Sequence, residues 1–429
     1  MGFTDNIAKE FEQLERGLNG QKGNFPFTVR RDALSAFQKL GIPGRKHEEW
    51  KYTNIKTQLP ESLSISQSNA ASVKAFNSFE NIRASKLVFV NGIFNKELSN
   101  IISEAGVTAG SLKEHFTTSK QLTEKHYGKL VNKYEEHFSV LNTAFATDGG
   151  FVHIQKGVNS EVPVFIIYLY DSPENFTQSR NLIIAEEGSS IKVVVDFQNI
   201  GSSSFYNHVS EIFVGKNANV NITKLQTATT NTTAVHTLEA DVERDGRFTS
   251  NTITFEGNLI RNSANVRLSG ENTDAHLNGL YYGKGNSLID NHILIDHLLP
   301  NCESKQLYKG ILDDESTGVF NGKIFVKQDA QKTNAFQSSK AILLSDDASV
   351  YSKPQLEIFA DDVKCSHGAA IGQLNENEIF YLRARGIYEK DAKSILTYAF
   401  ANDVIELIAI EELKEYLDTQ LKFRLGLDF

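Results

Sequence analysis

The chain has 429 residues, of which 40% are hydrophobic and 23% charged, with a formal net charge of −9 and a pI of about 5.7. This length predicts two or three domains, and the acidic balance argues against sequence-independent nucleic-acid binding, which needs Lys and Arg to neutralise phosphates. Two cysteines form no disulfide framework and indicate a reducing compartment. Because no apolar run resembles a secretion signal or a membrane span, we expect a soluble, cytoplasmic protein.

Residues 1–147 predict a mainly helical region with one β-hairpin. Four apolar residues share one face of a first helix: Ile7, Phe11, Leu14 and Leu18. A second helix is expected from 29 to 40, and Gly41 ends it. Asn91-Gly92 lies between two β-rich runs, which is typical of a tight hairpin turn. Helical patterning returns after the hairpin and continues to about residue 147.

Residues 148–362 are dominated by short alternating runs such as IKVVVDF and TSNTITFEG, which predict β-strands. Polar turns recur near Gly188, Asn217, Gly246, Asn272, Asp314 and Asp347, and most of the intervals are roughly 26 to 33 residues. One extra turn, GKGNS, interrupts the series. The interval matches one coil of a parallel β-solenoid. An antiparallel sandwich or barrel is the alternative, but its turns recur every ~8–12 residues, so the pattern favours the solenoid.

Residues 363–429 predict a C-terminal helical domain. Asn375, followed three positions later by Glu378, is typical of an N-terminal cap and opens the helix EIFYLRARG. Two further helices are expected in EKDAKSILTYAFA and VIELIAIEELKEYLDTQLKFRLG. A solenoid leaves unpaired strand edges at its ends, so we expect the helical segments at both termini to cover them.

The segment DDVKCSHGAAIGQ, residues 361–373, holds one of the two cysteines and a histidine two positions later. In an extended strand, Cys365 and His367 point to the same face with Cα atoms ~6.5 Å apart, so both can reach one metal ion. A complete site needs about four donors, and no other Cys or His is close in sequence. Three interpretations stay open: half of a metal site, a nucleophile with its base, and a structural thiol.

A second polar group lies in DNHILIDHLLPNC and comprises Asp290, His292, Asp296, His297 and Cys302. Strand alternation puts Asp290, His292 and Asp296 on one face, as in a metal or acid–base site. The alternative is that they merely face outward while the intervening isoleucines face the core.

Two segments resemble phosphate-binding motifs but do not match them. GVFNGKI lacks the spacing and the Ser or Thr of a P-loop, and GKGNSL lacks the third glycine of a dinucleotide fingerprint.

Three segments carry a resemblance to a known family: GRKHEEWKYTNIK (44–56), the stretch 290–374 that begins DNHILIDHLLPNCESKQLYKG, and FYLRARGI (380–387). Together they resemble the SufB/SufD family of iron–sulfur cluster assembly proteins, and the similarity extends over nearly the whole chain. The resemblance implies a mainly β fold, with a right-handed parallel β-helix core flanked by N-terminal and C-terminal helical segments. The solenoid expected from the turn spacing agrees with this implication.

The resemblance also implies a function that is not enzymatic. Such a chain pairs with SufB through the β-helix and binds the SufC ATPase through its C-terminal helical region, so that SufC supplies ATP hydrolysis. A nascent iron–sulfur cluster forms at the SufB–SufD interface, and the match assigns a contribution to His367, with Cys365 as the neighbouring thiol. Reduced flavin is associated with the complex, although no residue of this chain is assigned to it. We expect the isolated chain to hold no cofactor.

Within the family, the segments DDVKCSHGA (361–369) and RKHEEWKYT resemble the SufD branch, whereas SufB-like chains carry an acidic EHEA-type segment in place of the first. A SufB-like chain is the alternative. Two readings lie outside cluster assembly: a carbohydrate-active β-helix enzyme that uses Asp290 and Asp296, and a docking strut without metal. We expect no nucleic-acid or membrane partner. An exposed β-helix edge also makes a homodimer plausible for the isolated chain.

Overall fold

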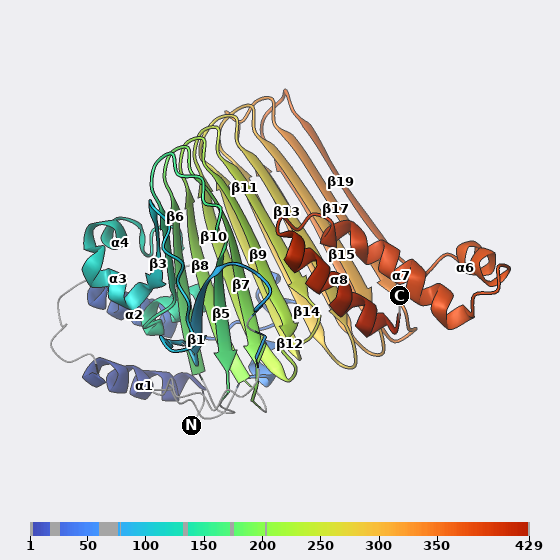
Figure 1. The fold of residues 1–429 in the computed structure, drawn as a ribbon, viewed down its shortest axis with the longest axis horizontal. Coiled ribbons are helices and arrows are strands. Elements are labelled where there is room, and N and C mark those ends of the chain that lie inside the picture. The colour runs from blue at the N-terminus through green and yellow to red at the C-terminus, as the bar shows by residue number, and fades with distance from the viewer. Residues whose placement is uncertain are drawn as a thin grey trace.

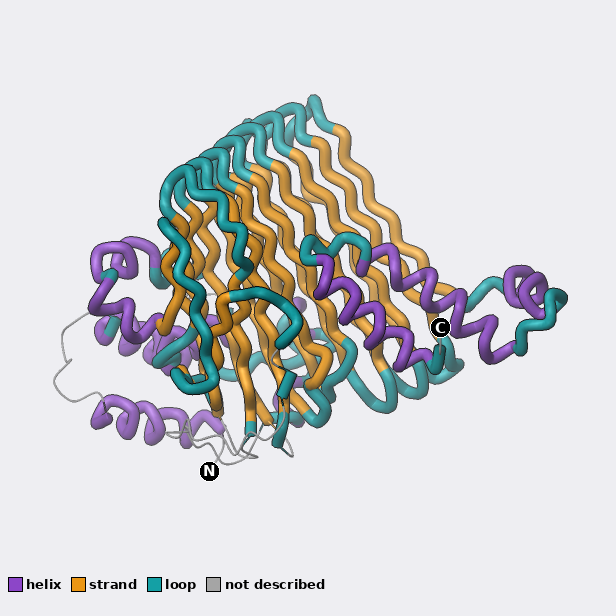
Figure 2. Tube along the Cα trace, in the orientation of Figure 1, coloured by secondary structure: helices purple, strands orange, loops and turns teal. Residues whose placement is uncertain are grey.

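The fold is that of a β-solenoid with helices at both termini, as the sequence predicts (Figure 1). The computed structural model describes residues 3–17, 26–59, 76–77, 79–131, 136–171, 176–201 and 204–427. The solenoid consists of a nine-stranded and a ten-stranded sheet, and the coils stack side by side along its axis (Figure 2). Among the described residues, no helix is both long and apolar enough to cross a membrane.

From β4 onward, successive strands alternate between the two sheets, so that each coil contributes one strand to each. The strands of the nine-stranded sheet are β3 (Val107–Ser111), β4 (Gly150–Ile154), β6 (Phe176–Ala185), β8 (Ser204–Val214), β10 (Thr232–Val242), β12 (Leu259–Leu268), β14 (Leu288–His297), β16 (Thr317–Val326) and β18 (Ser349–Ile358). Those of the ten-stranded sheet are β1 (Ser85–Val90), β2 (Ile93–Phe94), β5 (Val164–Tyr170), β7 (Ser190–Asn199), β9 (Asn219–Ala228), β11 (Arg247–Thr254), β13 (Asp274–Gly283), β15 (Glu303–Leu312), β17 (Asn334–Leu343) and β19 (Lys364–Gly372).

The recurring turns form two columns at the corners of the solenoid. In one column, Gly188, Asn217, Asp245 and Asn272 adopt positive φ, at intervals of 29, 28 and 27 residues (217 − 188, 245 − 217, 272 − 245). Each turn donates a backbone amide to the next coil; Asn217 N lies 2.9 Å from the carbonyl of Arg244, for example. The extra turn at GKGNS belongs to the opposite corner, where the amide of Gly285 bonds to Asp314 at 3.0 Å. The coil length predicted from the sequence is therefore confirmed.

The N-terminal helices pack on the outer face of the nine-stranded sheet. They are α1 (Phe3–Gly17), α2 (Phe27–Leu40), α3 (Leu112–Thr118), α4 (Lys120–His126) and α5 (His137–Phe145), with two short 3-10 turns at Glu48–Trp50 and Ile55–Thr57. Phe11 and Phe37 share a buried cluster with Phe138 of α5 and Phe205 of β8. The helix expected from 29 to 40 is confirmed, whereas Leu18 and the segment 132–135 lie outside the described residues.

The predicted hairpin at Asn91-Gly92 is also confirmed, because both residues have positive φ and β1 pairs antiparallel with β2. The sequence did not reveal that β1 continues into the solenoid by pairing in parallel with β5. Likewise, the helical region expected up to residue 147 is interrupted between α4 and α5. The N-terminal region therefore supplies strands to both sheets, as well as the helices that cover one face.

The solenoid continues past the expected boundary at residue 362, because β19 pairs in register with β17 as a further rung. This strand carries small and polar residues, and nearly all of it is exposed, so it lacks the apolar alternation that identifies the inner strands. Helix α6 (Glu376–Arg383) begins only a few residues later. Its predicted cap is confirmed, since the side chain of Asn375 accepts a hydrogen bond from Asn377 N at 2.9 Å.

The C-terminal helices do not cover the end of the solenoid, which corrects the expectation from the sequence. Helices α7 (Glu389–Ile405) and α8 (Glu411–Leu425) lie instead across the outer face of the ten-stranded sheet, and α6 extends beyond the strands (Figure 1). The buried residues Val404 and Leu417 belong to the same cluster as Leu280 and Ile311 of that sheet. The helices bury an apolar stripe, and only the face of a sheet offers matching apolar area; an open end offers mostly backbone edges.

Candidate functional site

Cys365 and His367 lie on β19, the terminal strand of the ten-stranded sheet, and both face the inside of the solenoid. Cys365 is the next rung after Ala335, which is fully buried in an interior cluster, and His367 is the next rung after the buried Gln337. Since no described strand follows β19 in the sheet, the interior is uncovered at this point and His367 is exposed. The predicted shared face is present, and it opens at the end of the solenoid.

These two side chains are too few to hold a metal ion by themselves. In the part of the chain that the structure describes, no group of three or more His, Cys, Asp or Glu side chains is placed to bind a metal. Burial raises the pKa of the Cys365 thiol, and a backbone hydrogen bond from Ala335 offsets this only in part. A thiolate is the form that binds metals and attacks electrophiles, so the surroundings of Cys365 do not activate it.

The open end combines free strand edges with exposed apolar side chains. β18 and β19 each stand last in the order of their sheet. Phe359 is 60% exposed and Ile371 47%, and Ile358 is also exposed. An edge with unpaired amides and carbonyls is a template for pairing with another chain, and exposed apolar groups add a reason to be covered. The inward-facing Cys365 and His367 therefore lie within a surface suited to a protein partner.

Cys302, whose role the sequence left open, is a structural thiol. It is fully buried, and its Sγ lies 3.2 Å from the carbonyl of Leu299 and 3.3 Å from that of Gly270. A buried thiol that donates to backbone carbonyls closes a turn and fills the core. Cys302 has no access to a ligand or to a partner.

The polar residues of DNHILIDH separate into different environments, so they do not form one site. Asp290, His292 and Asp296 face outward, while His297 faces inward and its Nε2 lies 2.9 Å from Ser304 Oγ. Ile293 belongs to the core cluster, as the outward-facing interpretation requires. Burial raises the pKa of the Asp296 carboxyl, with nearby lysines and an arginine opposing this.

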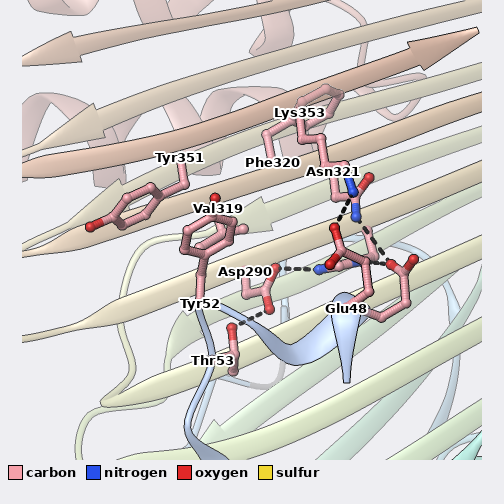
Figure 3. Close-up of a pocket in the computed structure, with 11 residues that line it drawn as sticks. Glu48, Tyr52, Thr53, Asp290, Val319, Phe320, Asn321, Tyr351 and Lys353 are labelled. Atoms are coloured by element: carbon pink, nitrogen blue, oxygen red, sulfur yellow. Dashed lines mark hydrogen bonds and ion pairs between the residues drawn. The ribbon is translucent and has the colours of Figure 1, made fainter. Parts of the chain in front are cut away.

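Asp290 and His292 instead bind the N-terminal segment Glu48–Thr53, which we call the clamp (Figure 3). Asp290 lies 2.6 Å from Arg261 and accepts a hydrogen bond from Thr53. His292 bridges the two segments, with Nε2 2.9 Å from Asp290 and Nδ1 3.1 Å from Glu49. Two motifs about 240 residues apart in sequence therefore meet at one network, which is buried at Asp290 and exposed at Glu49.

Other residues of the clamp extend these contacts to the last strand of the sheet. Lys353 of β18 lies 2.6 Å from Glu48, and Tyr351 stacks on Tyr52 with ring centroids 4.3 Å apart. At the other side, Arg261 of β12 lies 3.8 Å above the ring of Trp50. The clamp thus spans four successive strands, β12, β14, β16 and β18, and ties the terminal coil to the N-terminal region.

The electrostatics of the clamp favour an ionised Asp290. Burial alone would raise its pKa, but His292 and Arg261, together with the hydrogen bond from Thr53, lower it to about 2. The hydrogen bond to His292 similarly lowers the pKa of Glu49. Such an arrangement binds two chain segments together and leaves no free acid. It contradicts the reading of Asp290 and Asp296 as a pair acting on carbohydrates, because Asp290 is fully buried under the clamp.

The near-match to a P-loop, GVFNGKI, lies in β16. Gly322 faces the interior of the solenoid, and Lys323 faces outward, with its Nζ 2.8 Å from Glu357. A P-loop instead follows a strand and opens a helix, whose N-terminal amides hold the phosphates. The geometry agrees with the sequence in assigning no nucleotide site to this segment.

Family models match the two halves of the chain. One, described as the SufBD protein N-terminal region, matches residues 2–166, and the other, described as SUF system FeS cluster assembly, SufBD core domain, matches residues 168–400. The chain belongs to the SufBD family. Its members include a SufBD family protein of Synechocystis, which is 29% identical over 95% of this chain and 93% of its own length. SufD of Escherichia coli and SufD of Bacillus subtilis are each 28% identical, over 91% of both chains.

SufBD membership agrees with the resemblance seen in the sequence, and it makes the chain a member of the iron–sulfur cluster assembly system.

The clamp is the feature that sequence reasoning missed. GRKHEEWKYTNIK and DNHILIDH were both noted, but nothing in a single sequence indicates that they touch. The only local signal was partly complementary chemistry, with Glu48 and Glu49 in one segment and the imidazole of His292 in the other.

Removing the charge of Asp290 tests the clamp. The substitution Asp290→Asn leaves the buried Arg261 without its carboxylate, so we expect the free energy of unfolding to fall by about 3–5 kcal/mol. Trp50 is the only tryptophan and is buried beneath Arg261, so its fluorescence reports on the clamp during urea denaturation. Asp296→Asn, on the same strand and without a close ion pair, is the matched control and should change stability little. Equal effects of the two substitutions would contradict a special role for the clamp.

The acid dependence of stability gives a second test. Asp290 has a depressed pKa of about 2 in the folded chain, against ~3.9 for an unperturbed aspartate, so the unfolded chain takes up the proton first. Its contribution to stability is therefore complete above about pH 4 and is lost as the pH falls toward 2. We expect unfolding free energies of Asp290→Asn to fall less steeply than those of the wild type over this range. Parallel curves would show that Asp290 does not supply this acid sensitivity.

Proposed function

We propose that this chain is a SufD-like scaffold subunit that pairs with SufB through the open end of its solenoid and contributes His367 to the nascent cluster site. The position of His367 supports this proposal most directly. His367 faces the interior of the solenoid on a terminal strand that no described segment covers. An imidazole there is positioned to complete a site with donors from a second chain. The cluster is cargo in this proposal, and the chain alone holds half of its binding site.

The shortage of donors supports this proposal over a complete metal site. One imidazole and one partly buried thiol fall short of the ligand sets that hold iron–sulfur clusters, which are most often four thiolates. Cys365 lies close enough to share the site, but the raised pKa of its thiol makes His367 the more suitable donor in the isolated chain. Pairing that covers the open end would also bury the exposed Phe359 and Ile371.

The choice of SufD over SufB rests on three observations. The segment DDVKCSHGA at 361–369 is the one expected of SufD-like chains, and two of the relatives are named SufD. In addition, the resemblance implies a separate assembly cysteine in the β-helix of SufB-like chains; here Cys302 is fully buried, and burial raises the pKa of the Cys365 thiol. Together these observations favour a subunit that completes a cluster site with its partner and does not accept sulfur itself.

We further propose that the C-terminal helices dock the SufC ATPase. Phe380 and Tyr381 of α6 are 72% and 56% exposed, and Tyr388, just before α7, is 81% exposed. Large aromatic side chains that remain in solvent are typical of a surface that a partner covers. The β-strand location of GVFNGKI supports ATP hydrolysis by the partner and a non-catalytic role for this chain.

Substitution of His367 tests the proposed role. On the complex reconstituted anaerobically with SufB and SufC, His367→Ala should lower the yield of cluster, measured as iron and sulfide per complex, by about 10-fold or more. Cys365→Ser should have the smaller effect. His276→Ala is the matched control, because His276 is a partly exposed histidine on the outer face of the same sheet. An unchanged yield in His367→Ala, with the complex still assembled, would refute the proposal.

A further inference from the structure

A short ladder of buried amides leads along the interior of the solenoid to His367. Gln306 of β15, Gln337 of β17 and His367 of β19 occupy successive rungs of the ten-stranded sheet. Both glutamines are buried, and Gln337 Nε2 donates to Gln306 Oε1 at 2.7 Å. Neighbouring rungs of a parallel sheet lie ~4.8 Å apart, which lets amide side chains bond from rung to rung.

The ladder leaves one acceptor free on the side of His367. Gln337 Oε1 is buried and has no hydrogen-bond partner among the described residues, although Gln337 Nε2 donates to Gln306; at the other end of the pair, Gln306 Nε2 is likewise without a partner there. A buried acceptor without a partner is costly, and its presence calls for an explanation. The oxygen of Gln306 accepts from the residue one rung further along, and in the same arrangement the donor for Gln337 Oε1 would come from residue 367. That residue is a histidine, whose ring N–H is a suitable donor.

The facing sheet is shaped to admit the Gln337 side chain. Gly322 of β16 points into the interior, and a Cβ at this position would lie 2.2 Å from Gln337 Nε2. Gly322 does not have a positive φ, so backbone conformation does not require glycine there. A Cβ there would also lie 2.6 Å from the ring of Phe320, so the amide and this ring share the space that glycine leaves. The sequence thus keeps a polar, unbranched side chain and the room for it at a point where an apolar pair would fill the core more simply.

We propose that Gln337 is a positioning residue, which accepts a hydrogen bond from one ring N–H of His367 and thereby directs the other ring nitrogen toward iron at the open end. This inference rests on the proposed function, since it concerns the same histidine. Histidines that bind metals commonly donate their second ring N–H to an acceptor, which sets the tautomer and the orientation of the ring. Gln306 acts one step further back by fixing the amide of Gln337.

Two substitutions at residue 337 separate positioning from packing. Gln337→Met keeps an unbranched side chain of similar size and removes the acceptor. Gln337→Glu keeps an acceptor for residue 367, and its second oxygen accepts from Gln306 Nε2 once the Gln306 amide turns over, which replaces the bond that Gln337 Nε2 donates. Gln355→Met is the matched control, because Gln355 lies on β18 but faces outward. Should Gln337→Met fail to fold, Gln306→Met removes the bond that fixes the amide and serves in its place.

The first measurement is the binding of ferrous iron, without a sulfur source, to the complex reconstituted with SufB and SufC. The second is the thermal unfolding midpoint of each variant as an isolated chain. We expect Gln337→Met to weaken iron binding about 10-fold or more, and Gln337→Glu and Gln355→Met to stay close to the wild type. Equal losses in Gln337→Met and Gln337→Glu, or no loss in either, would overturn the positioning role. His367→Ala distinguishes the two proposals: if it leaves iron binding intact, the proposed function itself fails, whatever residue 337 does.

Discussion

In-register stacking of parallel coils is the constraint on which the rest of the structure depends. Each inward side chain lies on the equivalent side chain of the next coil, at the spacing of neighbouring strands. Apolar residues therefore form continuous columns, such as Ala264, Ile293 and Gly322 in the nine-stranded sheet. The same register lets polar residues bond from rung to rung: Asn262 donates to Asn291 at 3.2 Å, and Gln337 to Gln306 at 2.7 Å.

The stack of coils has two ends, and they differ: one is covered by the chain itself and the other is open to a partner. At the N-terminal side, helices and the hairpin cover the first coils. At the other side, the last coil is held from outside by the clamp, through Tyr351 and Lys353, but its edges and interior are left open. The terminal coil is thus held in place but uncovered. Its unpaired backbone amides and carbonyls are already ordered before a partner binds, which prepares the surface for another chain.

Much of this organisation could be predicted from the sequence, and the exceptions have physical causes. Turn spacing predicted the solenoid because each coil needs its own corner, whereas β19 was missed because an end strand has no apolar neighbour on its open side. The helices were expected at the open end, but the stripe around Leu417 requires an apolar sheet face. The clamp joins Glu49 to His292 across the fold, and such a contact leaves no periodic signal in one sequence. Cys365 and His367 were found by their spacing, while the ladder behind them required knowledge of the register.

Hydrogen exchange at the open end tests the central claim, that the last coil is a preformed half-site completed by a partner. The amides of β18 and β19 on the outer edges exchange freely in the isolated chain if no segment pairs with them. Mixing the chain with SufB should slow exchange in β18 and β19 and leave inner strands such as β12 unchanged. Protection that appeared elsewhere on the molecule, with β18 and β19 exchanging as before, would contradict this account.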